Sequence, residues 1–297
     1  MLVVAALVVL AGLLAWPVPR VLARATGLRK APRAALVLWQ STAVAAVLAA
    51  LLAAPAAVPA LIGRQVRLSE HWVVVGVAAA LSAVVAARLL LSGDRVGRNL
   101  RAARRRHREL VDLLGDPRDG DHRTRVLEHT TPTAYCVPGV HRRVVLTQGT
   151  IDRLATDELD AVLAHERAHL AARHDLVMEF FTVVHEAVPR FVRCDAALRE
   201  IHLLIEVLAD RAAVRGAGVL STGRAIVAMA GGPKPAGTMA MRESTADARA
   251  RIELLDADRV AGLPVPLAAA AMYAVSVAIL AAPLALFALA ITELTLV

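Results

Sequence analysis

Residues 163–170 read LAHERAHL and place two histidines four positions apart, His165 and His169, with Glu166 directly after the first. Residues i and i+4 of an α-helix share a face, so both imidazoles would point to one side. Thr156 suits an N-cap, the acidic residues after it suit the positive end of a helix dipole, and no proline or glycine interrupts the segment. The pattern therefore predicts a helix that presents two nitrogen donors and a carboxylate.

Two histidines at this spacing can bind one Zn²⁺ ion through their imidazole nitrogens, with Zn–N bonds of about 2.0–2.1 Å. Glu166 would lie beside that metal, where it can take a proton from water and pass it to a leaving amine. The competing interpretation is a solvated helix whose charges pair on its surface.

A catalytic zinc takes three protein ligands and keeps one position open, so a third ligand is expected on another element. Residues 198–214 have a strongly amphipathic helical pattern, with Glu206 and Asp210 on one face. Glu206 is the predicted third ligand, and Asp210 the predicted acceptor for the N–H of a ligating imidazole. His202, one turn before Glu206, is a rival ligand.

Apolar and charged residues occupy different parts of the chain. Its 297 residues are 57% hydrophobic, yet they include 34 Lys+Arg and 26 Asp+Glu, which excludes both a disordered chain and one buried wholly in lipid. No charge falls in residues 1–19, 34–63 or 261–292, and residues 72–91 carry only Arg88. Because about 20 apolar residues cross a bilayer, four transmembrane helices are predicted.

The predicted fold class is mainly α, with an α+β domain inserted between the third and fourth transmembrane helices. Residues 1–91 hold the first three helices, and residues 261–297 hold the fourth with a short outer tail. Residues 92–260 form the charged block between them, which is large enough to bury its own core.

Positive charge predicts the orientation in the membrane. Arginine and lysine gather in residues 20–33 without any acid, and seven arginines lie between residues 95 and 108. Since positive residues are retained on the cytoplasmic side, both termini are expected outside and the block 92–260 in the cytoplasm. Anionic lipid headgroups explain the second cluster more simply than nucleic acid, because no aromatic residue interleaves it. The lipid bilayer is thus an expected partner, direct nucleic-acid binding is not, and Cys136 and Cys194 are expected to be reduced.

H-E-x-x-H followed downstream by E-x-x-x-D resembles the gluzincin metallopeptidases. Residues 134–154, AYCVPGVHRRVVLTQGTIDRL, are similar to the segment before the zinc helix in membrane gluzincins of the M48 and M56 peptidase families. In that resemblance they form a strand, a turn at residues 138–139 and an edge strand at 143–146. An edge strand can pair with an extended substrate peptide, so the candidate substrate-binding residues are Arg143, Val144, Val145 and Leu146.

The layout of three spans before the zinc domain and one after it resembles the M56 family of beta-lactam sensor-transducers. Because the chain stops at Val297, the extracellular penicillin-binding domain of those sensors, and beta-lactam sensing with it, is not expected. The resemblance implies one Zn²⁺ held by His165, His169 and Glu206, with Glu166 as general base and Asp210 supporting a ligand. It also implies regulated cleavage of a cytoplasmic protein such as a winged-helix repressor.

Two other functions stay open: a quality-control peptidase resembling the M48 family, and a non-catalytic membrane signalling module whose zinc is structural. The second would need a fourth ligand, for which His202 is the best candidate. The group that stabilises the oxyanion is also open between Tyr135, His185 and Arg251. His174 and His185 are otherwise expected to be structural or surface residues.

Overall fold

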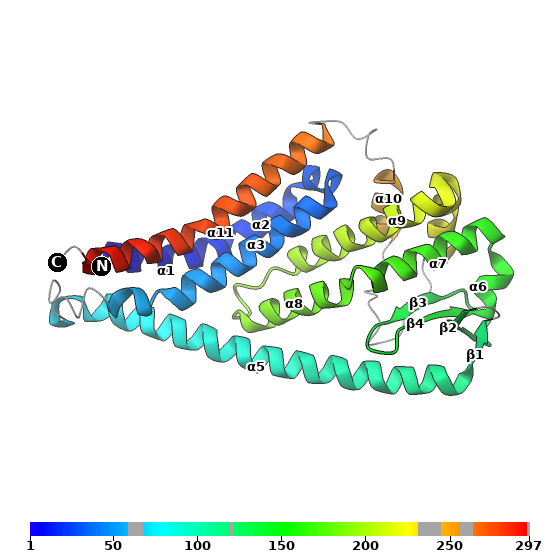
Figure 1. The fold of residues 1–297 in the computed structure, drawn as a ribbon, viewed down its shortest axis with the longest axis horizontal. Coiled ribbons are helices and arrows are strands. Elements are labelled where there is room, and N and C mark those ends of the chain that lie inside the picture. The colour runs from blue at the N-terminus through cyan, green and yellow to red at the C-terminus, as the bar shows by residue number, and fades with distance from the viewer. Residues whose placement is uncertain (59–67, 119–120, 231–244, 256–263, 296–297) are drawn as a thin grey trace. The chain divides into compact units, whose positions relative to one another are not determined.

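The computed structural model describes residues 1–58, 68–118, 121–230, 245–255 and 264–295. These residues are mainly helical and contain one four-stranded sheet (Figure 1). The chain divides into two compact units. We call Met1–Asp94, Thr182–Glu200 and Pro266–Val297 the helical unit, and Arg95–Phe181 with Ile201–Val265 the sheet unit.

Apolar helices make up most of the helical unit. They are α1 (Leu2–Ala15), α2 (Pro17–Arg24), α3 (Pro32–Leu52), the first part of α5 (Leu68–Leu114) and α11 (Val265–Thr295), with short 3₁₀ turns η1 (Thr26–Lys30) and η2 (Pro55–Ala57). Proline opens α2 and α3, where its missing N–H has no helical partner to lose. Leu7 and Ala11 of α1 are buried in one cluster with Ala49 of α3, whose small side chain permits close helix packing.

Four helices are long and apolar enough to cross a membrane: Leu2–Arg24, Pro32–Leu52, His71–Leu114 and Val265–Thr292. The predicted spans 1–19 and 72–91 lie within the first and third. The predicted span 34–63 is shortened, because α3 ends at Leu52 and η2 follows from Pro55, whose missing N–H removes one helical hydrogen bond. Residues 59–63 and 261–263 of the predicted spans lie outside the described residues.

The sheet contains β1 (Gly115–Arg118), β2 (Asp121–Leu127), β3 (Ala134–Val137) and β4 (Arg143–Thr147), in the order β1-β2-β4-β3. β2 pairs with β4 in parallel, and the other pairs are antiparallel. The β3–β4 hairpin turns at the predicted place, where Gly139 has a φ of 137° that glycine alone adopts readily.

The prediction that residues 143–146 form an edge strand is wrong. Arg143, Val144, Val145 and Leu146 belong to β4, which pairs with β3 on one side and with β2 on the other. A β3–β4 hairpin alone would leave the other side of β4 unpaired, but β2 pairs with that side in parallel. Among the described residues, the edges of the sheet are β1 and β3.

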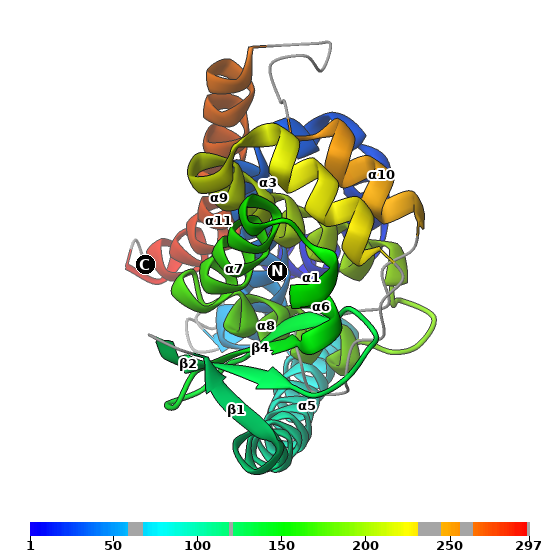
Figure 2. The same ribbon diagram turned by 90° about the vertical axis from the view of Figure 1, so that its right-hand side faces the viewer.

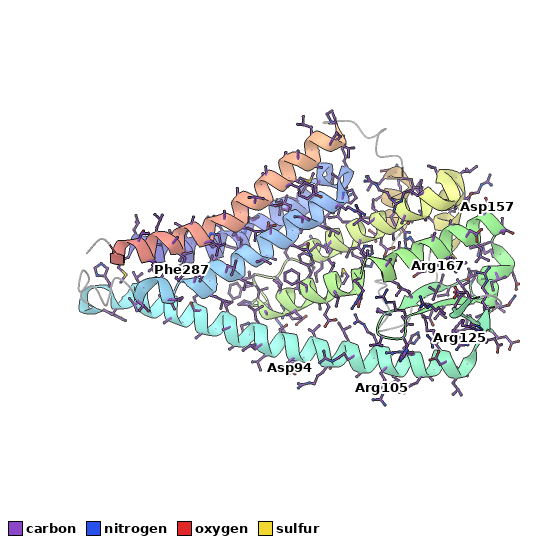
Figure 3. All side chains as sticks on the ribbon, in the orientation of Figure 1. Asp94, Arg105, Arg125, Asp157, Arg167 and Phe287 are labelled. Atoms are coloured by element: carbon purple, nitrogen blue, oxygen red, sulfur yellow. The ribbon has the colours of Figure 1, made fainter. Side chains whose placement is uncertain are left out.

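Helix α7 (Thr156–Ala171) follows α6 (Gln148–Arg153) and packs on the sheet (Figure 1, Figure 2). Leu159 and Leu163 of α7 share a buried cluster with Leu146 of β4. Arg167 of α7, labelled in Figure 3, donates a hydrogen bond to Asp121 of β2 at 3.0 Å. The helix begins at Thr156 itself, so its N-cap is Ala155, one residue before the expected N-cap. The backbone N–H of Ala155 donates to Glu158 at 3.1 Å.

The remaining helices are α8 (His174–Ala187), α9 (Asp195–Met229) and α10 (Thr245–Glu253). A left-handed residue, Arg173 with φ 52°, separates α7 from α8, and Gly218 with φ 84° interrupts α9. The helical unit includes Thr182–Glu200, the end of α8 and the start of α9. Sequence analysis did not predict that this segment groups with the apolar helices rather than with the sheet.

Candidate metal centre

Three side chains from two helices of the sheet unit converge on one point. His165 Nε2 and His169 Nε2 of α7 lie 3.0 Å apart, and the carboxylate of Glu206 on α9 lies 3.4 Å from the first and 3.5 Å from the second. Ligands of one tetrahedral zinc, with bonds of about 2.0–2.1 Å, are separated by about 3.3 Å. The two imidazole nitrogens and the Glu206 carboxylate therefore lie close enough to one another to hold a single ion.

The chemistry of this donor set also fits a metal. Glu206 Oε2 is buried and accepts no hydrogen bond of normal geometry within the described part of the chain, although charged groups lie near it. Two imidazole nitrogens and one carboxylate oxygen are a combination that zinc binds in enzymes that keep an open position. His202 is not in the group that the described residues bring together, and its Nε2 lies 3.9 Å from Glu206 Oε1.

Asp210 contacts His165, the first of the predicted ligands. Its Oδ1 lies 2.9 Å from His165 Nδ1, which leaves Nε2 directed at the metal position. Arg251 of α10 donates to both oxygens of Asp210, at 2.7 and 2.6 Å, and its third nitrogen lies 3.2 Å from Glu206 Oε2. One buried guanidinium thus holds both carboxylates of α9.

The electrostatics of the metal-free centre follow from these contacts. Burial opposes ionisation of Glu206 and Asp210, but the charge of Arg251 and the contacts with His165 together outweigh burial and hold the pKa of both carboxyls below its usual range. Burial alone would lower the pKa of His165, but its close contacts with the carboxylates of Asp210 and Glu206 raise that pKa to about 9. A metal at this position therefore replaces a proton on His165.

His174 supports the second ligand and was missed by the sequence analysis, which expected a structural or surface residue. Its Nδ1 lies 3.0 Å from His169 Nδ1. The left-handed conformation of Arg173 ends α7 and begins α8 at His174. Burial lowers the pKa of His174 to about 4, so the ring is neutral at pH 7. The signal was available in the sequence, as a third histidine five positions after the second.

Glu166 is buried on α7 beside the metal ligands, as expected of a general base. It shares a hydrogen bond with the thiol of Cys136 on β3, another residue that the sequence analysis did not place in the site. Burial and the charge of Glu166 raise the pKa of this thiol well above its ordinary value. Cys136 is therefore a neutral donor to Glu166 and not a reactive thiolate.

The three candidates for stabilising an oxyanion lie in different places. Tyr135 on β3 is buried, and its hydroxyl lies 3.0 Å from His107 Nε2. His185 belongs to the helical unit and lies 2.9 Å from Asp195. Arg251 alone reaches the centre, where its contacts go to the two carboxylates. This role stays unassigned.

A cavity adjoins the metal centre inside the sheet unit. His165, Glu166, Asp210 and Arg251 line one part of it, and most of the remaining wall is small or apolar: Ala134, Ala161, Val162, Ala213, Ala225, Ile226 and Met229. Ala134 belongs to β3, an edge strand among the described residues, so the cavity is lined both by Glu166 and by an edge strand.

A helix carrying H-E-x-x-H, a carboxylate from a second helix, and a buried acid–base group beside a cavity define a metal-dependent hydrolase. Residues 99–255, just over half of the chain, match the sequence profile of peptidase family M48. The chain belongs to this family and is a metallopeptidase. No curated protein and no solved structure matches it.

Proposed function

We propose that this chain is a multipass membrane zinc endopeptidase that cleaves a cytoplasmic protein. The observation that carries the proposal is the metal centre, in which two imidazole nitrogens and one carboxylate group lie 3.0–3.5 Å from one another beside a buried Glu166. The match to family M48 supports peptide-bond hydrolysis, and the four apolar helices support a membrane location.

Each residue of the centre has a role in that reaction. Zinc, when bound, supplies a Lewis acid that polarises the scissile carbonyl. Glu166 takes a proton from the attacking water and delivers it to the leaving nitrogen. Asp210 and His174 orient the two imidazole ligands, at 2.9 and 3.0 Å, and Arg251 balances the carboxylates.

Substrate binding is proposed at β3 instead of at residues 143–146. An extended peptide can add to the free edge of β3 by backbone hydrogen bonds. Ala134 of this strand lines the cavity, whose wall of alanine, valine, isoleucine and methionine suits an apolar side chain of medium size. We therefore expect such a side chain next to the scissile bond.

The arginine distribution supports a cytoplasmic active site with both termini outside. Three candidate spans begin before the peptidase region and one follows it, which supports the M56-like layout. This layout in turn supports the cleavage of one regulator, such as a winged-helix repressor. The M48 match supports equally the alternative of a membrane quality-control peptidase. A structural zinc is less well supported, because His202 is not in the donor group.

The test compares protein N-termini across the proteome of cells that carry the parent chain and cells that carry Glu166→Gln. Glu128→Gln, an exposed glutamate of the same unit, is the matched control. New N-termini in one DNA-binding protein support the signalling role, and many in unfolded membrane proteins support quality control. In both cases an apolar residue should flank the cleaved bond. If parent and Glu166→Gln cells have the same N-termini, the proposal is wrong.

A further inference from the structure

The connection between α8 and α9, residues 188–194, is bound by an arginine that lies inside an apolar segment. Arg88 of α5 is the one charged residue of segment 72–91, and the apolar surface continues beyond it, since Leu90 and Leu91 are 76% and 69% exposed. Its guanidinium donates to the carbonyl oxygens of Ala187 and Val188, the latter at 3.2 Å. A charge inside an apolar segment needs polar partners, and the carbonyl groups at the end of α8 provide them.

A second arginine binds the same connection from near the end of the first candidate span, Leu2–Arg24. Arg20 of α2 reaches the carbonyl oxygens of Phe191, Val192 and Arg193 at 3.5, 3.2 and 3.3 Å. The same guanidinium lies 5.7 Å from the ring of Trp16. Tryptophan and arginine at the end of an apolar helix are typical of a membrane–water interface. An interface at Trp16 and Arg20 would place the connection at the same level.

The side chains of the connection are those of an interfacial segment. Phe191 is 80% exposed and Trp16 is 57% exposed, and Arg20 contacts both residues. Arg190, directly before Phe191, is also exposed. An exposed phenylalanine beside an exposed arginine fits a lipid surface, where the ring meets acyl chains and the guanidinium meets phosphate.

We propose that residues 188–194 are inserted into the lipid leaflet next to Arg20, with the ring of Phe191 at the boundary of headgroups and acyl chains. Lipid is the partner because the arginines that hold the backbone come from two helices long and apolar enough to cross a membrane. Figure 1 shows this connection beside α5. The block 92–260 would thus touch the membrane at a segment that lies, in the sequence, between α7 and the part of α9 that carries Glu206. This contact does not depend on catalysis.

The test uses the full-length protein with Cys194→Ser and Phe191→Cys, labelled with an environment-sensitive fluorophore and placed in vesicles of phosphatidylcholine and phosphatidylglycerol. Val140→Cys in the same background is the control, because Val140 is 91% exposed in the β3–β4 turn. The parent with Cys194→Ser alone measures labelling of Cys136. Bound zinc per chain confirms that each labelled variant has folded.

We expect nitroxide-labelled lipid to quench the probe at position 191 several-fold more than the probe at 140, and aqueous iodide to do the reverse. Equal iodide quenching at both positions would overturn the proposal, since the connection would then face water. Protection of position 191 from both quenchers would also overturn it, since the ring would then pack on protein. If Phe191→Cys does not fold, Val192→Cys provides the same measurement.

Discussion

Replacing Asp210 by asparagine removes one charge from the metal centre and nearly preserves its shape. The amide oxygen can still accept from His165 Nδ1, which lies 2.9 Å from the carboxylate. It cannot accept both hydrogen bonds of Arg251, now 2.7 and 2.6 Å long. The variant therefore separates the charge of Asp210 from its volume.

The expected loss has two parts. Replacing the carboxylate partner of a metal-bound imidazole by a neutral amide is expected to lower metal affinity about 10- to 100-fold, or about 1.4–2.7 kcal/mol. Leaving the buried guanidinium of Arg251 without its main partner costs up to about 3–5 kcal/mol of folding stability. Glu206, 3.2 Å from Arg251, offsets part of this cost, so the lower end of that range is expected. In the double variant Asp210→Asn, Arg251→Gln the cost should be less than the sum of the two single costs.

Zinc affinity is measured by competition with a chelator, and stability by thermal unfolding of the metal-free protein in detergent. Asp160→Asn, on the exposed face of α7, is the matched control and should change neither. If Asp210→Asn binds zinc within twofold of the parent, Asp210 does not support the metal. If the double variant costs the full sum, the contact with Arg251 does not couple the two side chains.

Two further predictions concern the histidines. His174→Ala should weaken zinc binding about 10- to 100-fold, because His169 loses its 3.0 Å partner, and His174→Gln should restore part of that loss. His185→Ala is the control, and equal affinities in all four proteins would contradict the assignment. The pKa of about 9 for His165 means that its ring is protonated at pH 7 in the metal-free protein. Zinc binding at pH 7 should therefore release about one proton from this ring, with affinity rising as the pH increases toward 9. Calorimetry in two buffers of different ionisation enthalpy measures this, and no release would refute it.

The residues of the candidate metal centre were predictable because the relevant pattern is local. His165 and His169 share a helix face by their spacing, and so do Glu206 and Asp210. That the two helices meet follows from the demand of a zinc ion for a third ligand, not from any signal in the chain between them. The apolar helices were predictable for a similar reason, since an uncharged apolar stretch of about 20 residues or more is typical of a transmembrane helix.

The missed features depend on contacts between distant residues or on a single backbone angle. The interior position of β4 results from its parallel pairing with β2, which no hairpin pattern reveals. The contact of His174 with His169 depends on one left-handed residue, Arg173, in a segment that reads as continuous helix. Arg251 reaches Asp210 across 41 positions, and Cys136 reaches Glu166 only because β3 packs on α7.

The central claim is that Glu166 acts beside a zinc ion held by His165, His169 and Glu206. It is tested most directly by purifying the full-length parent and Glu166→Gln, measuring zinc per chain, and following cleavage of an unfolded protein substrate. We predict one zinc in both proteins, cleavage by the parent, and a loss of at least about 100-fold in the variant. Cleavage by Glu166→Gln at the rate of the parent would contradict the account, as would a parent that cleaves without any bound metal.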